Sequence, residues 1–159
     1  MRRLDCAVKL ARWGPGRHGA YRGAVKWTAA FLAWTLLVWG GRIRNAVADP
    51  ALDAGGRTGP LLLSLSFVLP ALVLAVVLVL QWRGGPAART VPAVTALAGW
   101  TTAVWVLRAG DIALGGDHEV GFVVVHVVLA VVSITLGWLA VRSLRRSAGR
   151  PADRHPVPS

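Results

Sequence analysis

The sequence predicts an all-α integral membrane protein, a compact bundle of four antiparallel transmembrane helices. Of its 159 residues, 55% are hydrophobic and only 16% are charged, and the mean hydropathy is +0.55. The apolar residues form long blocks rather than a periodic pattern, which is typical of membrane spans. The charges lie at the ends of these blocks, so a net charge of +11 does not indicate a nucleic-acid-binding face.

Turn-forming and capping residues separate the apolar blocks. Pro60 is expected in the first turn of the second span, where its missing N–H costs nothing. Thr90 is expected to cap the third span, and Asp117 is the candidate N-cap of the fourth. The four expected spans cover about residues 24–41, 60–82, 91–107 and 119–141.

Basic segments precede and follow the expected spans. Residues 1–23 form a basic leader, and residues 143–159 form a basic, proline-containing tail that we expect to be disordered. Fourteen of the 18 Lys and Arg residues lie at the leader end, in the second loop or in the tail, and four lie near the other two loops. The positive-inside rule therefore predicts a multi-pass protein of the bacterial cytoplasmic membrane with both termini in the cytoplasm.

His126 is the one histidine inside an expected span. It lies roughly 10 Å below the outer surface, at a rise of 1.5 Å per residue. A polar side chain at that depth is costly unless it faces the bundle and finds a partner. One interpretation makes His126 a proton carrier, a ligand or part of an outward-opening substrate pocket. The other makes it structural, bonded to Thr102 or Ser66 and holding two helices in register.

Charged residues gather at the same outer end. The arginines and carboxylates there are expected either to form interfacial ion pairs that close the bundle, or to line a polar vestibule above His126. In the second case Arg42 or Arg44 binds an anion or a lipid headgroup. The candidate polar site comprises His126, Arg42, Arg44, Arg108, Asp111, Asp117 and Glu119.

Small residues recur at helical spacing on the third and fourth spans, which is typical of faces where another helix approaches closely. These candidate helix-packing residues are Gly99, Thr102, Ala130, Ser133 and Gly137.

The sequence contains no pattern for a cofactor, a metal or catalysis. Haem between helices needs facing histidines, and the chain has no second intramembrane histidine. The adjacent residues Asp117, His118 and Glu119 lack metal-ligand spacing. P-loop, GxSxG and CxxC motifs are missing, so we expect no cofactor and no enzyme.

Three short motifs carry a resemblance to a protein group. They are the run 39–45 (WGGRIRN), the pair 110–111 (Gly-Asp) and the triplet 116–118 (Gly-Asp-His) before the helix that bears His126. In these motifs the chain resembles small, uncharacterised four-span membrane proteins of high-GC Gram-positive bacteria. The resemblance implies a four-span fold and transfers no catalytic or binding residue.

Two functional hypotheses follow. The leading one is a non-enzymatic accessory or scaffold subunit in the lipid bilayer, which packs through small-residue helix faces against itself or another membrane protein. The alternative is binding or transport of a small molecule, lipid or quinone at an outward-facing site around His126. Nucleic acid is not an expected partner.

Overall fold

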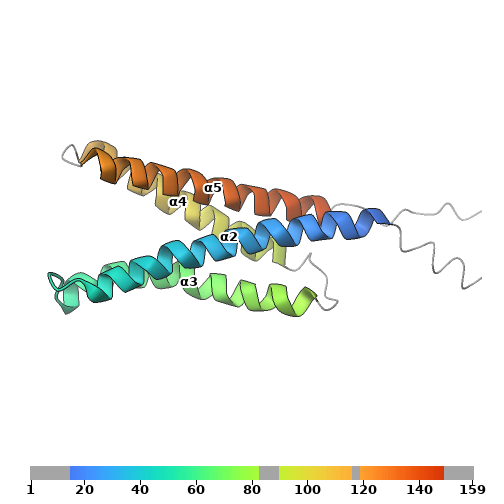
Figure 1. Cartoon of the computed structure of the whole chain (residues 1–159), viewed down its shortest axis with the longest axis horizontal. Coiled ribbons are helices and arrows are strands. Elements are labelled where there is room, and N and C mark those ends of the chain that lie inside the picture. Colours follow the sequence, from blue (N-terminus) through green and yellow to red (C-terminus); the bar gives the residue numbers. More distant parts are fainter. Residues whose placement is uncertain (1–14, 83–89, 116–118, 149–159) are drawn as a thin grey trace, which may run out of the picture.

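The described residues form four helices that run antiparallel in chain order (Figure 1). A computed structural model describes residues 15–82, 90–115 and 119–148. Within these ranges there is no strand. The helices are α2 (Pro15–Ala48), α3 (Ala54–Trp82), α4 (Val91–Leu114) and α5 (Val120–Ala148). The all-α fold class is therefore confirmed.

The helices extend beyond the expected spans. Helix α2 has 34 residues and is roughly 50 Å long at 1.5 Å per residue, more than the ~30 Å hydrocarbon core of a bilayer. It begins inside the expected leader, and α5 continues to Ala148, inside the expected tail. Helix α2 also continues to Ala48 and α4 to Leu114, so Arg42, Arg44 and Arg108 lie on helices rather than in loops.

The start of α3 differs from the expectation. The sequence predicts Pro60 in the first turn, but α3 begins at Ala54 and Pro60 lies inside it. The reason is an upstream cap: Oδ1 of Asp53 accepts a hydrogen bond from the backbone N–H of Gly56 at 2.7 Å. At the start of α4, Thr90 occupies the N-cap position, as expected, but its side chain forms no capping hydrogen bond.

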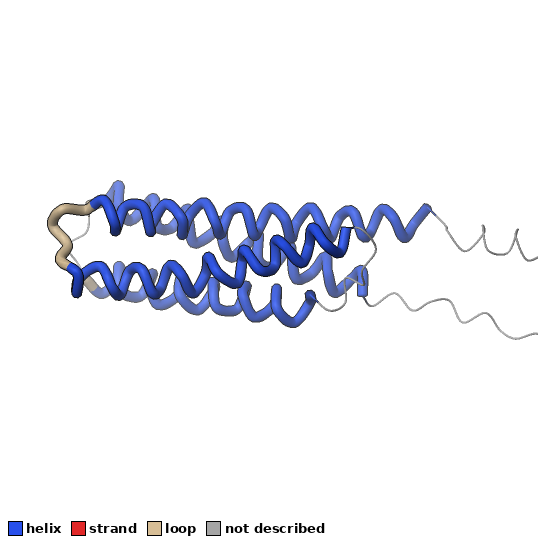
Figure 2. Tube along the Cα trace, turned by 90° about the horizontal axis from the view of Figure 1, so that it is seen from below, coloured by secondary structure: helices blue, strands red, loops and turns tan. Residues whose placement is uncertain are grey.

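Two hairpins make up the bundle, α2 with α3 and α4 with α5. Helix α2 packs against both α3 and α5, and α5 packs against α4, whereas α3 and α4 contact each other little. Figure 2 shows the helices aligned along one axis, with the α2–α3 connection opposite the end where α2 begins and α5 ends, here called the terminal end. In Figure 1, α2 and α5 are close at the terminal end and separate toward the other end, here called the outer end.

Aromatic residues fill the core between α2 and α3. Phe31 and Phe67 are fully buried, and Trp39 is nearly so. The Trp39 and Phe67 rings stack with centroids 4.0 Å apart and an interplanar angle of 4°. The buried hydroxyls of Thr28 and Thr35 donate to carbonyls one turn earlier, at 2.9 Å and 2.8 Å, so both donors are satisfied within the core.

The outer surface of the bundle is apolar. Two helices, α3 and α5, are long and apolar enough to cross a membrane, with a mean hydropathy of 2.8 and 2.5 in their most apolar stretches. Only 22% and 11% of those stretches are buried inside the protein. Core helices of soluble proteins are instead mostly buried. The exposed apolar side chains thus require an apolar environment or a partner.

Helices α2 and α4 do not meet the same hydropathy criterion. Helix α2 carries Lys26 and, near its end, Arg42 and Arg44, while α4 carries Arg108 and Asp111. Both helices also contain tryptophans and threonines, which lower the mean hydropathy. Length and composition therefore support membrane crossing for two of the four expected spans, those in α3 and α5.

Candidate functional site

A cavity of about 530 Å³ lies between the two hairpins at the outer end. All four helices contribute to its wall, which is mainly apolar and rich in aromatic rings, with cations on α2 and α4. We call it the outer cavity. It is lined by Trp34, Leu37, Val38, Trp39, Gly41, Arg42, Asn45, Leu63, Val104, Trp105, Arg108, Phe122, His126 and Leu129.

His126 is half-buried and faces this cavity from α5. Its Nδ1 lies 2.8 Å from the carbonyl oxygen of Phe122, one turn earlier. A carbonyl only accepts, so Nδ1 carries the proton of that bond. In a neutral ring Nε2 is then an acceptor, and it has no hydrogen-bond partner among the described residues. Phe122 also packs against the imidazole, with ring centroids 3.9 Å apart.

The expected structural partners of His126 are bonded elsewhere. Thr102 donates to the carbonyl of Ala98 at 2.9 Å. Ser66 donates to the carbonyl of Leu63 and accepts from Trp100. The expectation that His126 bonds Thr102 or Ser66 is therefore wrong. Hydroxyls in a helix reach a carbonyl of their own helix more easily than a neighbouring helix.

Trp105 brings an unsatisfied donor to the cavity wall. Its side chain is only 7% exposed, yet its indole N–H has no partner in the part of the chain that the structure describes. The ring lies edge-on to His126, with centroids 6.4 Å apart. An unmet buried donor costs about 1–3 kcal/mol. By contrast, the indole N–H of Trp34, which also lines the cavity, donates to the Ser133 hydroxyl at 2.9 Å.

Two arginines from different helices face the same cavity. Arg42 lies beyond the expected end of the first span, with its guanidinium carbon 5.9 Å from the Trp39 ring centre. Although the residue is exposed to solvent, desolvation by neighbouring groups, followed by the positive charge of Arg108, lowers the pKa of Arg42 below its usual value. Arg42 forms no ion pair with any described carboxylate. The part of the cavity wall that Arg42 and Arg108 form is therefore electropositive.

Arg108 is partly compensated. Its Nη1 lies 2.6 Å from Oδ2 of Asp111, which is the one salt bridge among the described residues. Its Nε is buried without a partner within the same residues. The guanidinium carbon also lies 5.8 Å from the Phe122 ring centre. The pairing orients Arg108 and leaves one of its donors unused beside the cavity.

The remaining candidates of the polar site are dispersed. Arg44 is exposed on α2 and does not line the cavity. Glu119 is exposed just before α5, where its carbonyl accepts from the N–H of Val123. Asp117 lies outside the described residues. The structure thus brings together His126, Arg42 and Arg108, with Asp111 beside Arg108.

Comparison with protein-family models, curated proteins and solved structures gives no match.

The small-residue candidates divide into inward and outward positions. Ser133 and Gly137 are buried, and a Cβ on Gly137 would lie 3.2 Å from the Cβ of Ala98. Thr102 and Ala130 are half-buried. Gly99 is exposed, with open space where a Cβ would stand. Ser133 and Gly137 therefore serve packing within the chain, and Gly99 faces outward.

Sequence reasoning missed Trp105 and Phe122 as wall residues, whereas Trp34 was expected at the depth of His126. A signal was present for both missed residues: Trp105 precedes Arg108 by three positions and Phe122 precedes His126 by four, so each pair shares a helix face. Within the described ranges, no group of three metal-ligating side chains comes together.

Proposed function

We propose that the chain is a multi-pass protein of a bacterial cytoplasmic membrane, with all four helices crossing the bilayer and both termini in the cytoplasm. The apolar surfaces of α3 and α5 support this, because each is mostly exposed. The two less apolar helices, α2 and α4, both pack against α5. In the sequence, the excess of Lys and Arg lies in the leader, the second loop and the tail, which favours a cytoplasmic position of these segments. The resemblance to small four-span proteins agrees with this arrangement.

Within that membrane, we propose that the outer cavity binds an anionic amphiphile of the lipid class and that the protein is a non-enzymatic binding or transport component. The observation that carries the proposal is the buried, unpartnered indole N–H of Trp105 in a cavity that also holds the unpaired Arg42. Unmet buried donors beside an uncompensated cation favour an incoming acceptor with negative charge.

Each wall residue has a distinct part in this binding. Arg42 and the free Nε of Arg108 bind the anionic head, and the indole N–H of Trp105 donates to a neutral oxygen below it. His126, through Nε2, accepts from a hydroxyl of the ligand. The apolar body then packs between Leu63, Val104 and Leu129.

Native mass spectrometry of the protein extracted with its own lipids tests this function. We expect a small molecule that is retained by the wild type and lost about tenfold or more in Arg42→Gln, because a hydrogen bond to a charged group contributes about 1.5–3 kcal/mol. Arg44→Gln is the matched control, since it removes the same charge from the same helix but not from the cavity wall. Equal retention in both variants would refute the assignment.

Trp105→Phe tests the contribution of the indole N–H separately from that of the shape of the cavity wall. The ring volume is largely kept and only the unpartnered N–H is lost. We expect about fivefold weaker binding, the value of one ordinary hydrogen bond. Retention of a neutral quinone rather than an anion would place the recognition at Trp105 and His126 and would remove the assigned role of Arg42.

A scaffold role is a second candidate for one specific reason. Gly99 is exposed on α4, and a Cβ there would meet no atom within 4 Å. An exposed glycine in a membrane helix allows close approach of another helix. Under this hypothesis Gly99→Leu shifts a homo-oligomer or a complex toward the monomer in native mass spectrometry, and an unchanged assembly would count against it.

A further inference from the structure

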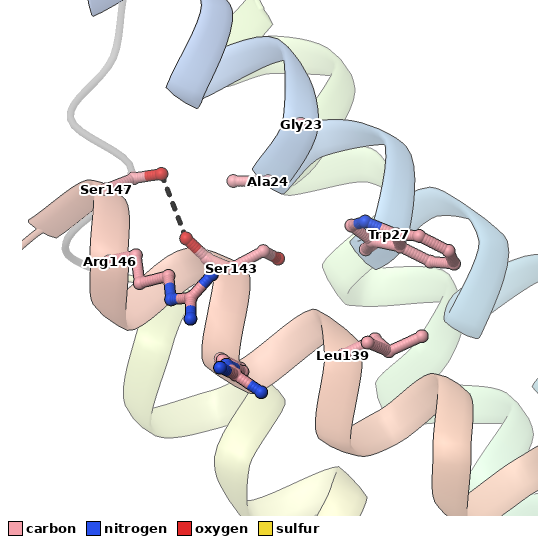
Figure 3. A pocket seen from close by; sticks show the side chains of 8 residues that line it. Gly23, Ala24, Trp27, Leu139, Ser143, Arg146 and Ser147 are labelled. Carbon is pink, nitrogen blue, oxygen red and sulfur yellow. Dashed lines mark hydrogen bonds between the residues drawn. The ribbon is translucent and has the colours of Figure 1, made fainter.

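A second hollow lies at the opposite end of the bundle, between the beginning of α2 and the end of α5 (Figure 3). Its volume is about 730 Å³, and we call it the inner groove. None of its residues lines the outer cavity. It is lined by Gly23, Ala24, Trp27, Leu139, Arg142, Ser143, Arg146 and Ser147.

The groove is polarised along the bundle axis. Arg146 and Ser147 lie toward the helix ends, whereas Trp27 and Leu139 lie deeper toward the middle of the bundle (Figure 3). Trp27 is 43% exposed, so its indole still offers surface for contact. A tryptophan at this depth is typical of the boundary between headgroups and acyl chains. The groove is therefore cationic toward the helix ends and apolar toward the middle of the bundle.

The cations of the groove are not neutralised by described carboxylates. Arg142 and Arg146 form no ion pair among the described residues. The described acids, Asp49, Asp53, Asp111 and Glu119, all lie at the outer end. These two exposed cations can attract an anion, and the cytoplasmic leaflet of a membrane presents anionic lipids.

Local contacts hold the groove in shape. The guanidinium carbon of Arg142 lies 4.7 Å from the centre of the exposed Trp138 ring, which restricts where the cation points. The Ser147 hydroxyl donates to the carbonyl of Ser143 at 2.9 Å, so this donor is satisfied within its own helix (Figure 3). Gly23 leaves the opposite wall open, because a Cβ at this position would meet no atom within 4 Å.

We propose that the inner groove binds the phosphate headgroup of an anionic membrane lipid, with Arg142 and Arg146 on the phosphate and an acyl chain against Trp27 and Leu139. The ligand is a lipid rather than free phosphate because half of the groove is apolar and serves no purpose for a small anion. This inference rests on the proposed membrane insertion, and it is independent of the outer cavity.

The test uses the full-length protein in nanodiscs of phosphatidylcholine, with and without phosphatidylglycerol, followed by native mass spectrometry of retained lipid. We expect the wild type to retain phosphatidylglycerol in preference to phosphatidylcholine. Arg146→Gln is expected to lower that retention about tenfold to a hundredfold, the effect of losing a hydrogen bond to a charged group.

Arg145→Gln is the matched control. Arg145 is the neighbouring residue, is equally exposed and carries the same charge, but it does not line the groove. A general surface attraction is worth about fivefold per arginine and would weaken both variants alike. Gly23→Leu changes no charge and fills the groove, so it is expected to lower phosphatidylglycerol retention as well.

The outcomes separate this proposal from the others. Equal loss in Arg145→Gln and Arg146→Gln overturns the groove, as does displacement of the lipid by millimolar inorganic phosphate. Arg44→Gln is expected to leave retention unchanged, since Arg44 is exposed at the outer end and lines neither the inner groove nor the outer cavity. A protein that does not enter nanodiscs refutes the membrane proposal itself, whereas one that enters without lipid preference refutes the inner groove alone.

Discussion

Gly137 offers a sharp test of the packing. An ideal Cβ at this position would lie 3.2 Å from the Cβ of Ala98 and 3.3 Å from Cε2 of Phe31. Both distances are tighter than ordinary carbon contacts, and Phe31 is fully buried and has little room to move. Gly137→Leu adds three more carbons beyond that Cβ. The substitution therefore forces α5 away from α2 and α4.

The magnitude follows from two opposing terms. Overpacking a well-filled contact costs typically about 1–3 kcal/mol and sometimes more. Replacing glycine by leucine inside a helix returns roughly 0.8 kcal/mol through helix propensity. The difference between the two terms is a net loss of up to about 2 kcal/mol for Gly137→Leu, and we expect the upper part of that range or more because the extra carbons meet the buried Phe31. The free energy of unfolding is measured by titrating sodium dodecyl sulfate into mild-detergent micelles.

Gly99→Leu is the matched control on the neighbouring helix. It gains the same propensity term, and its Cβ meets open space, so we expect no loss of monomer stability. Equal stability of the Gly99→Leu and Gly137→Leu proteins would refute the packing of α5 described above. A loss confined to Gly99→Leu would instead show that the outward face of α4 is occupied by a partner.

Two further predictions concern the α2–α3 hairpin. Phe67→Ala removes the ring stacked on Trp39 and is expected to lower the free energy of unfolding by about 3–5 kcal/mol, whereas Leu69→Ala, on the exposed face, is expected to change it little in the same titration. A Phe67→Ala protein as stable as Leu69→Ala would contradict the stack. Asp53→Ala removes the cap of α3 and is expected to cost about 1 kcal/mol. Amide hydrogen exchange of Gly56 should then accelerate, and unchanged exchange would argue against the cap.

The helices themselves were predictable, because long apolar blocks between polar turns indicate helices whatever packs against them. Their ends were not. Nothing between Arg42 and Ala48 breaks a helix, so α2 continues past the expected membrane boundary. Pro60 indicates a helix start in the sequence, although Asp53 caps the helix upstream and a proline inside a membrane helix is tolerated.

The candidate site was predictable only in part. His126 is conspicuous in the sequence because its depth in an apolar block makes it costly. Trp105 is not conspicuous, since a missing partner for an indole N–H depends on which atoms surround it. Arg42 lies on α2 and Arg108 on α4. The distance between their charges depends on how far the two hairpins separate at the outer end, which the sequence does not show.

The contacts of the described carboxylates at the outer end bear on two expectations, closure of the bundle by ion pairs and a vestibule that binds a ligand. Asp53 caps α3, and Asp49 accepts from the backbone N–H of Ala51 at 2.9 Å. Asp111 pairs with Arg108, so three of the four described acids are committed to local contacts that leave Arg42 out. A network selected to close the bundle would pair Arg42, because a partly desolvated cation beside another cation is unfavourable. Under the proposed function, an anionic ligand head would remove that cost on binding, so the unpaired Arg42 would contribute to affinity.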